Sequence, residues 1–86
     1  MTDLVRLGLA AGMKVRFRRV PSDRWKPATV ECVEKDGSLG LRDAKGAARA
    51  IPVELVEVAT RGPRGAWTWE RVVDRAAREE QLTLFG

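Results

Sequence analysis

The feature that most constrains this chain is a series of short alternating segments separated by tight-turn residues. In residues 14–18, basic and apolar residues alternate strictly. Successive side chains of a strand point to opposite sides, so Val15 and Phe17 would share a buried face. The pair Asp36-Gly37 favours a hairpin turn, because glycine readily supplies the positive φ that a tight turn needs. The expected building unit is therefore a short antiparallel strand.

Five such strands are expected, at residues 14–18, 25–33, 39–42, 48–51 and 56–58. Pro52 predicts a short helical turn before the last strand, since proline suits the first helical position. Five short strands cannot bury one face as a flat sheet, so we expect them to curl into a small barrel without exposed edges. In the second strand, Cys32 alternates with Ala28 and Val30 and is expected to be a small buried residue.

The barrel is expected to occupy residues 12–58, with an N-terminal segment at 1–11, a Gly/Pro linker at 59–66, a helical region at 67–80 and a tail at 81–86. Thr68 is a suitable N-cap, so the helix should begin there. Its apolar face is predicted to carry Trp69, Val72, Val73 and Ala76. In the N-terminal segment, Leu4, Leu7 and Leu9 suggest a short helix over one end of the barrel. The expected fold class is mainly β: a five-stranded barrel, one C-terminal α-helix and a tail.

Several classes of function are disfavoured by what the chain lacks. It has no histidine and one cysteine, which rules out an intramolecular disulfide and disfavours a zinc site and the usual nucleophile–base pairs. No pair of carboxylates stands out as an acid/base dyad. We therefore expect a protein that is not an enzyme, with no metal, no cofactor and no small-molecule substrate.

No apolar run approaches the roughly 20 residues that span a bilayer, and no basic leader precedes the first leucines, so neither a membrane segment nor a signal peptide is expected. A single cysteine permits the reducing cytoplasm, which is the expected compartment. The balance of 16 Lys/Arg against 12 Asp/Glu favours an acidic partner such as nucleic acid.

Basic residues gather at and after the first strand. They are Lys14, Arg16 and Arg18 on its outer face, followed by Arg19, Arg24 and Lys26. Such a row predicts contact with the phosphates of DNA or RNA, with a solvated strand face as the alternative. No base-reading motif is visible, so binding would follow the backbone and not the sequence. Nothing in the sequence supports base stacking by Trp25 or Trp67.

The order of apolar and turn positions resembles the Tudor-like small barrels of the Src-homology-3-like architecture. The resemblance is carried by Gly12-Met13-Lys14-Val15, Trp25, Pro27-Ala28-Thr29-Val30, Asp36-Gly37, Asp43, Gly46 and Ile51-Pro52-Val53-Glu54-Leu55. It covers roughly residues 12–58 and implies a fold, not a function. Many Tudor domains hold methylated side chains in an aromatic cage, but this chain has too few aromatic residues for one.

The C-terminal residues resemble the peptide by which bacterial replication and repair proteins dock on the β sliding clamp. Gln81, Leu82, Leu84 and Phe85 match that motif, and Thr83 replaces its usual Ser or Asp. The resemblance implies that the peptide binds in extended form. Leu84 and Phe85 would then fill a deep pocket, with Leu82 as a secondary contact and Gln81 as a hydrogen-bonding group at the pocket mouth. Alternatively, the apolar residues fold back onto the barrel.

The sequence thus predicts an accessory protein of bacterial DNA replication or repair that docks on the clamp and contacts DNA through its basic face. Two alternatives remain open. One is a general RNA- or DNA-binding barrel with a structural tail. The other is a protein-interaction adaptor that docks through the helix expected at residues 68–80.

Overall fold

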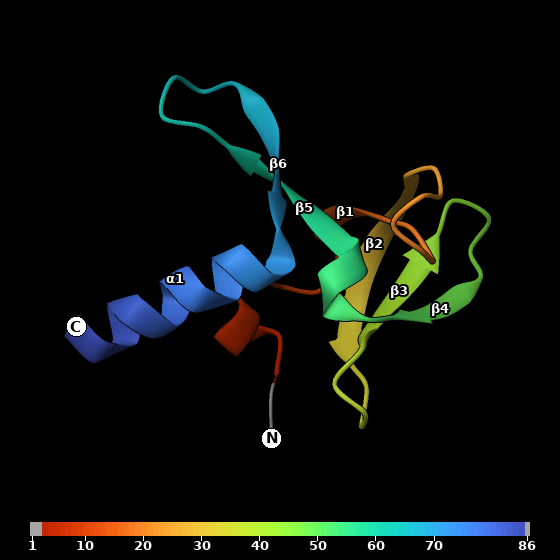
Figure 1. Cartoon of the computed structure of the whole chain (residues 1–86), viewed down its shortest axis with the longest axis horizontal. Coiled ribbons are helices and arrows are strands. Elements are labelled where there is room, and N and C mark those ends of the chain that lie inside the picture. The colour runs from red at the N-terminus through yellow and green to blue at the C-terminus, as the bar shows by residue number, and fades with distance from the viewer. Residues whose placement is uncertain (1–2, 86) are drawn as a thin grey trace.

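The computed structural model describes residues 3–85, with side-chain surroundings for residues 3–81. One antiparallel sheet and one α-helix make up most of the chain (Figure 1). The strands are β1 (Lys14–Phe17), β2 (Lys26–Val33), β3 (Leu39–Asp43), β4 (Ala48–Ile51), β5 (Val56–Arg61) and β6 (Trp67–Arg71). The helices are η1 (Val5–Leu7) and η2 (Val53–Leu55), both 3-10, and α1 (Val72–Phe85). The expectation of a mainly β fold with one C-terminal helix is confirmed.

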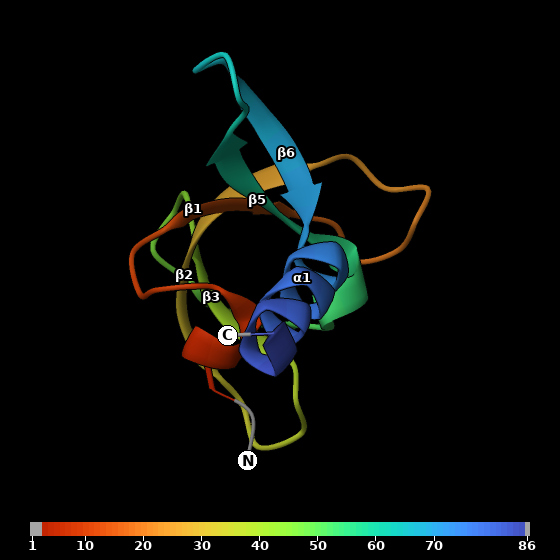
Figure 2. The same cartoon turned by 90° about the vertical axis from the view of Figure 1, so that its left-hand side faces the viewer.

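The strands lie in the order β4-β3-β2-β1-β5-β6, so β1 pairs with both β2 and β5. The alternation predicted for β1 is observed, because Val15 and Phe17 are buried and Lys14 is exposed. Figure 2 shows the sheet curled around η1 and the beginning of α1. Leu7, Leu9 and Val72 from these segments are buried in the same core as the strand residues. The N-terminal segment therefore closes the core, as its leucines suggested.

The strand count corrects the expectation of five. The sheet has six strands, and β4 and β6 form its two edges. Within residues 3–85 no pairing joins these edges, so the sheet is open in its hydrogen bonding. In the same part of the chain, no helix is both long and apolar enough to cross a membrane.

The prediction that the C-terminal helix begins at Thr68 is wrong by about one turn. Residues 67–71 form β6, which pairs with β5 from Glu57↔Arg71 to Arg61↔Trp67. The expected linker is the end of β5 and a hairpin loop, closed by the Gly62 amide donating to the Ala66 carbonyl at 2.8 Å. Tryptophan and threonine favour strands, and the alternation here has period two. The helix begins where that alternation ends, at Val72.

The prediction of a buried Cys32 is also wrong, because this residue is exposed. The register between β2 and β3 shifts after Val30↔Leu41, so that Cys32 lies opposite Gly40. One extra residue on β2 makes this a β-bulge, which reverses the side-chain alternation beyond it. Sequence alternation alone cannot locate such a shift.

The helix α1 packs on η1, η2, β5 and β6 through one side. Val72 is fully buried at its start, and Arg75, Ala76 and Glu79 continue the stripe as half-buried residues. The far end of α1 extends away from the sheet (Figure 1). The backbone of residues 81–85 belongs to this helix, so it is not an extended tail. The side chains of Leu82, Thr83, Leu84 and Phe85, and the whole of Gly86, lie outside the described residues.

Candidate functional site

The outer side of the sheet carries a cluster that we call the tryptophan face. It consists of Trp25, Trp67 and Trp69 together with Lys14, Arg16, Arg18, Arg61 and Arg71. The Arg16 guanidinium lies between two rings, 4.5 Å from the centre of Trp25 and 4.6 Å from the centre of Trp69. Arg18 stacks over Trp25 at 4.2 Å, and Arg61 over Trp67 at 5.4 Å. Both distances are within the range of attraction between a cation and an aromatic ring.

Strand register explains why these side chains meet. Residues directly opposite each other in an antiparallel pair project to the same side of the sheet. Arg16 lies opposite Glu57, which in turn lies opposite Arg71. Ala59 and Arg61, which follow on β5, lie opposite Trp69 and Trp67. The alternation of β1, β5 and β6 thus collects cations and aromatic rings on one surface.

Two adjoining hollows cross this face. The larger, of about 560 Å³, is lined by Met13, Lys14, Ala59, Trp67, Thr68 and Trp69. The second, of about 340 Å³, shares Lys14 and Trp69 and continues over Pro27 and Thr29 to Arg42. Ala59 is small, which leaves open space between the two exposed tryptophans of β6. Together the hollows form a mainly apolar track across the sheet, whose charged lining residues are Lys14, Arg42 and Asp43.

The cations of the face differ in their pairing. Arg16 Nε donates to Glu57 Oε1 at 2.8 Å, and its Nη2 contacts the same oxygen, so its charge is compensated. Arg42 is likewise paired with Glu31, at 2.6 Å. Lys14, Arg18, Arg61 and Arg71 form no ion pair with any residue that the structure describes. The tryptophan face therefore carries a net positive charge beside its rings.

The other residues of the predicted basic row lie beyond this face. Arg19 and Lys26 line a third hollow of about 280 Å³, which shares Pro27, Asp43 and Ala44 with the second hollow. Lys26 is also 3.9 Å from Asp23. Arg24 is exposed in the loop between β1 and β2. The structure therefore brings Lys14, Arg16 and Arg18 together with the tryptophans, and it separates Arg19, Arg24 and Lys26 from them.

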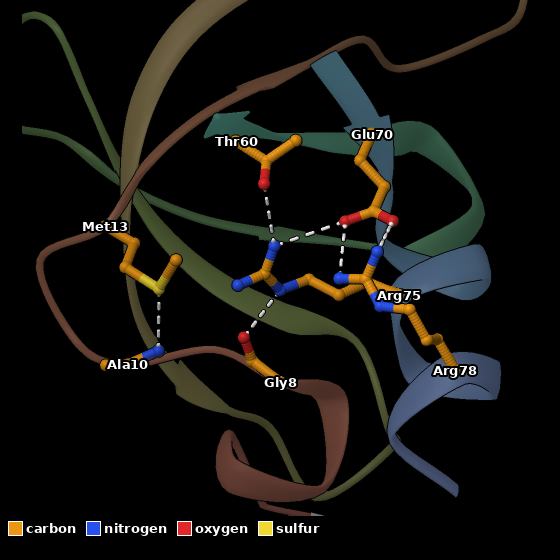
Figure 3. A network of polar contacts seen from close by, with 7 residues as sticks. All are labelled: Gly8, Ala10, Met13, Thr60, Glu70, Arg75 and Arg78. Carbon is orange, nitrogen blue, oxygen red and sulfur yellow. Dashed lines mark hydrogen bonds and ion pairs between the residues drawn. The ribbon is translucent and has the colours of Figure 1, made fainter. Parts of the chain in front are cut away.

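On the opposite side of the β5–β6 hairpin, a polar network joins three segments (Figure 3). Arg75 Nε donates to the Gly8 carbonyl at 2.6 Å, and its Nη1 donates to Glu70 Oε1 at 3.2 Å and to Thr60 Oγ1 at 3.4 Å. Arg78 donates to both oxygens of Glu70, at 2.8 and 3.2 Å. The Glu70 and Arg75 side chains are only 18% and 16% exposed. This network connects η1, the hairpin and α1, and it leaves little for a ligand to contact.

The ionisable groups in the turns have structural explanations. Hydrogen bonds from Ser38 lower the pKa of Asp36, and the Ala47 amide, followed by Arg49, lowers that of Asp43. Desolvation, together with Glu34, raises the pKa of the Cys32 thiol, which disfavours the thiolate. Among the described residues, no group of three or more Cys, Asp or Glu is placed to hold a metal ion.

The predicted clamp-binding residues lie at the far end of α1. Gln81 is exposed there. For Leu82, Thr83, Leu84 and Phe85 the structure gives the helical backbone alone. Comparison with known protein families, with curated proteins and with solved structures finds no match.

Five residues of the face were not predicted as site residues: Trp25, Trp67, Trp69, Arg61 and Arg71. Trp69 was expected on the apolar, buried face of a helix, yet it lies on β6 and is 42% exposed. The signal that identifies three of them is the strict alternation of Trp67, Trp69 and Arg71 after a Gly/Pro loop. A second alternating run after such a loop is typical of a hairpin.

Proposed function

We propose that this chain is a non-enzymatic accessory protein of bacterial DNA replication or repair. Its tryptophan face contacts the DNA backbone, and residues 81–85 dock on the β sliding clamp. The observation that carries the proposal is an exposed, net positive aromatic face in the same small chain as the sequence Gln-Leu-Thr-Leu-Phe. The cytoplasm, where both partners occur, is the proposed compartment.

Backbone contact is supported by three cations that form no ion pair with any described residue. Lys14 lines both hollows of the track. Arg61 lies opposite Trp67, and Arg71 follows Trp69 on the same side of β6, so each of the three can neutralise one phosphate. Every phosphate neutralised releases condensed counterions, so affinity should fall linearly with the logarithm of salt concentration. Phosphate contacts of this kind position a protein without reading sequence. The proposed DNA binding is therefore largely independent of sequence.

Clamp docking is supported by the motif and by its place in the fold. Gln81 is exposed at the end of a helix that extends away from the sheet, where a partner can reach it (Figure 1). A peptide that binds in extended form must leave the helix first. Unwinding residues 81–85 breaks the hydrogen bonds that their amides donate one turn back, but these lie at the end of the helix, where fraying is common. Burying Leu84 and Phe85 could then supply about 3–6 kcal/mol before ordering costs.

The proposed architecture is a Tudor-like barrel with additions. This proposal is supported by the order of the first five strands. Strands β1, β2 and β3 each pair with the next strand in the chain, and β5 pairs with β1. The 3-10 turn η2 lies between β4 and β5, at the position of the expected helical turn. In this proposal β6 and α1 extend the barrel, and β6 supplies the two most exposed tryptophans.

The two contacts strengthen each other through tethering. A protein held on the clamp meets nearby DNA at a raised effective concentration, which can increase overall affinity by about 10²–10⁴ without new contacts. A weak tail and a weak DNA face are therefore sufficient.

Calorimetric titration into purified bacterial clamp tests the docking step. Wild type should bind, whereas Leu84→Ala/Phe85→Ala should lose at least about tenfold in affinity, because anchor side chains dominate small interfaces. Glu80→Ala, next to the motif, is the matched control and should bind like wild type. Glu80→Pro, which ends the helix before the motif, should bind at least as tightly. Equal binding by wild type and the double variant would contradict docking.

A second candidate is a general nucleic-acid-binding protein whose C-terminal residues are structural. The continuation of α1 through Phe85 favours it, because the amides of residues 81–85 already have partners one turn back in the helix. In that case, deletion of residues 81–86 leaves nucleic-acid binding unchanged and lowers stability, and the clamp is not bound.

A further inference from the structure

The tryptophans of β6 have an exposure that the fold itself does not explain. Trp67 is 68% exposed and Trp69 is 42% exposed, two residues apart on the same side of one strand. Large aromatic side chains usually bury most of their surface, and single exposed ones are common. Two adjacent ones beside an open hollow form a patch of the kind that marks a binding site.

The rings are also held in place. Arg16 lies between Trp25 and Trp69 and is fixed by Glu57, while Arg61 covers one side of Trp67. Trp69 and Arg16 come from strands that flank β5, so the sheet itself sets their spacing. A ring that is already ordered loses little side-chain entropy when a ligand stacks on it.

We infer that the tryptophan face binds single-stranded nucleic acid, with bases stacking at Trp67 and Trp69 and phosphates at Lys14, Arg61 and Arg71. The inference rests on the proposed nucleic-acid binding and names its substrate class. Base faces are hidden within the stack of a duplex, so aromatic platforms act on unpaired bases. A basic groove with aromatic side chains is the general means of binding single strands without regard to sequence.

The shape and charge of the track fit this occupant. The hollow beside Trp67 and Trp69, of about 560 Å³, is within the range of pockets that hold small ring compounds. Its apolar floor and the unpaired charge of Lys14 at its edge suit a base and its phosphate. The second hollow leads on over Pro27 to Arg42, which gives the strand a continuous path across the sheet.

Fluorescence anisotropy with the full chain tests the inference. The probes are a labelled 12-nucleotide oligothymidine and a labelled 12-base-pair duplex, at one fixed salt concentration. Wild type should bind the single strand at least tenfold more tightly than the duplex. Trp67→Ala/Trp69→Ala should weaken single-strand binding by about 10- to 100-fold and leave duplex binding within about twofold.

Two controls separate stacking from other effects. Trp67→Phe/Trp69→Phe keeps aromatic faces and should retain most single-strand affinity, and circular dichroism should be unchanged in both double variants because these side chains are exposed. Wild-type tryptophan fluorescence should be quenched by the oligothymidine.

The outcomes distinguish this inference from the proposed function. Salt-dependent duplex binding at wild-type strength, with no single-strand preference and no effect of Trp67→Ala/Trp69→Ala, overturns the inference and leaves the proposed function standing. Absence of binding to both probes overturns both. Displacement of the oligothymidine by polyglutamate of equal charge and concentration also overturns the inference, because the face would then recognise negative charge or acidic protein without stacking.

Discussion

The two sides of strand β6 come from five consecutive residues and have opposite characters. On the side that faces α1, the Glu70 carboxylate accepts hydrogen bonds from Arg75 and Arg78 and is mostly buried. On the other side, Trp67 and Trp69 are exposed, and Arg61, which lies over Trp67, forms no ion pair with any residue that the structure describes. The usual placement of polar and apolar residues is reversed in this strand. The polar side stabilises the fold, and the aromatic side remains available to a partner.

The difference between the two sides follows from the free-energy cost of burying a charged group without a partner. A buried charge without a partner is strongly unfavourable, whereas an exposed ring loses only the benefit of burial. Changes on the network side should therefore act on stability, and changes to the exposed rings of Trp67 and Trp69 should act on binding. The largest effect on stability is expected at Glu70, on the network side.

Glu70→Ala should lower the free energy of unfolding by about 2–3 kcal/mol, because the half-buried guanidinium of Arg75 loses its counter-charge. The measurement is urea denaturation followed by circular dichroism. Trp67→Ala, from the other side of the same strand, should cost less than about 0.5 kcal/mol. The comparison fails if Trp67→Ala is the more destabilising of the two.

Gly8→Ala should cost about 2 kcal/mol. Its φ is +72°, and a Cβ there would lie 2.8 Å from Glu79 Cγ on α1. Gly12 has a similar φ of +92° but nothing within 4 Å of an added Cβ, so Gly12→Ala should cost only about 1 kcal/mol. The difference between the two unfolding free energies measures how tightly η1 packs on α1. Equal losses would show that this packing is loose.

Arg16→Lys should lower stability by about 1 kcal/mol, since a lysine ammonium cannot stack flat between two rings. Lys14→Arg, on the same strand and without an ion pair among the described residues, should leave stability unchanged. Thermal unfolding measures both. If Arg16→Lys matches wild type, the stacking between Trp25 and Trp69 is not what orders the tryptophan face.

The smallest effect on stability is expected from lowering the pH. The pKa of Asp43 is lowered in the folded protein, chiefly by the Ala47 amide, so folding favours the ionised form. This contribution is complete above the ordinary aspartate pKa of about 3.9 and is lost as the pH falls through the lower folded value. Asp43→Asn should therefore destabilise the protein more at pH 7 than at pH 3. Lys45→Ala, in the same turn, should not show this change with pH.

The part of the fold that the sequence predicts well is the part governed by local pattern. Residues 14–18 alternate, and Asp36-Gly37 and Asp43 with Gly46 mark turns, so β1 to β5 were expected near their observed places. The bulge that exposes Cys32 depends on pairing with β3, which single-strand alternation does not encode. Local pattern therefore predicts which segments are strands but not their register.

The candidate site was predicted only in part for the same reason. Lys14, Arg16 and Arg18 share one side of a single strand, which alternation reveals directly. Their contact with Trp69 requires β5 to lie between β1 and β6, a long-range arrangement. The Gly/Pro loop at residues 62–65 suggested a linker, and Trp69 falls at helical spacing from Val72 and Val73. The pairing of residues 67–71 with β5 outweighed this helical spacing, so Trp69 lies in a strand.

The central claim is that the tryptophan face binds nucleic acid through cations that form no ion pair with the residues that the structure describes. The most direct test is the slope of log K against log salt concentration for binding of the oligothymidine. Wild type should show a linear decrease, and Lys14→Ala should reduce the slope by about 1, the loss of one phosphate contact. Lys35→Ala, which removes the same charge from the β2–β3 turn, should leave the slope unchanged. Equal slopes for Lys14→Ala and wild type, or binding that does not depend on salt, would contradict the claim.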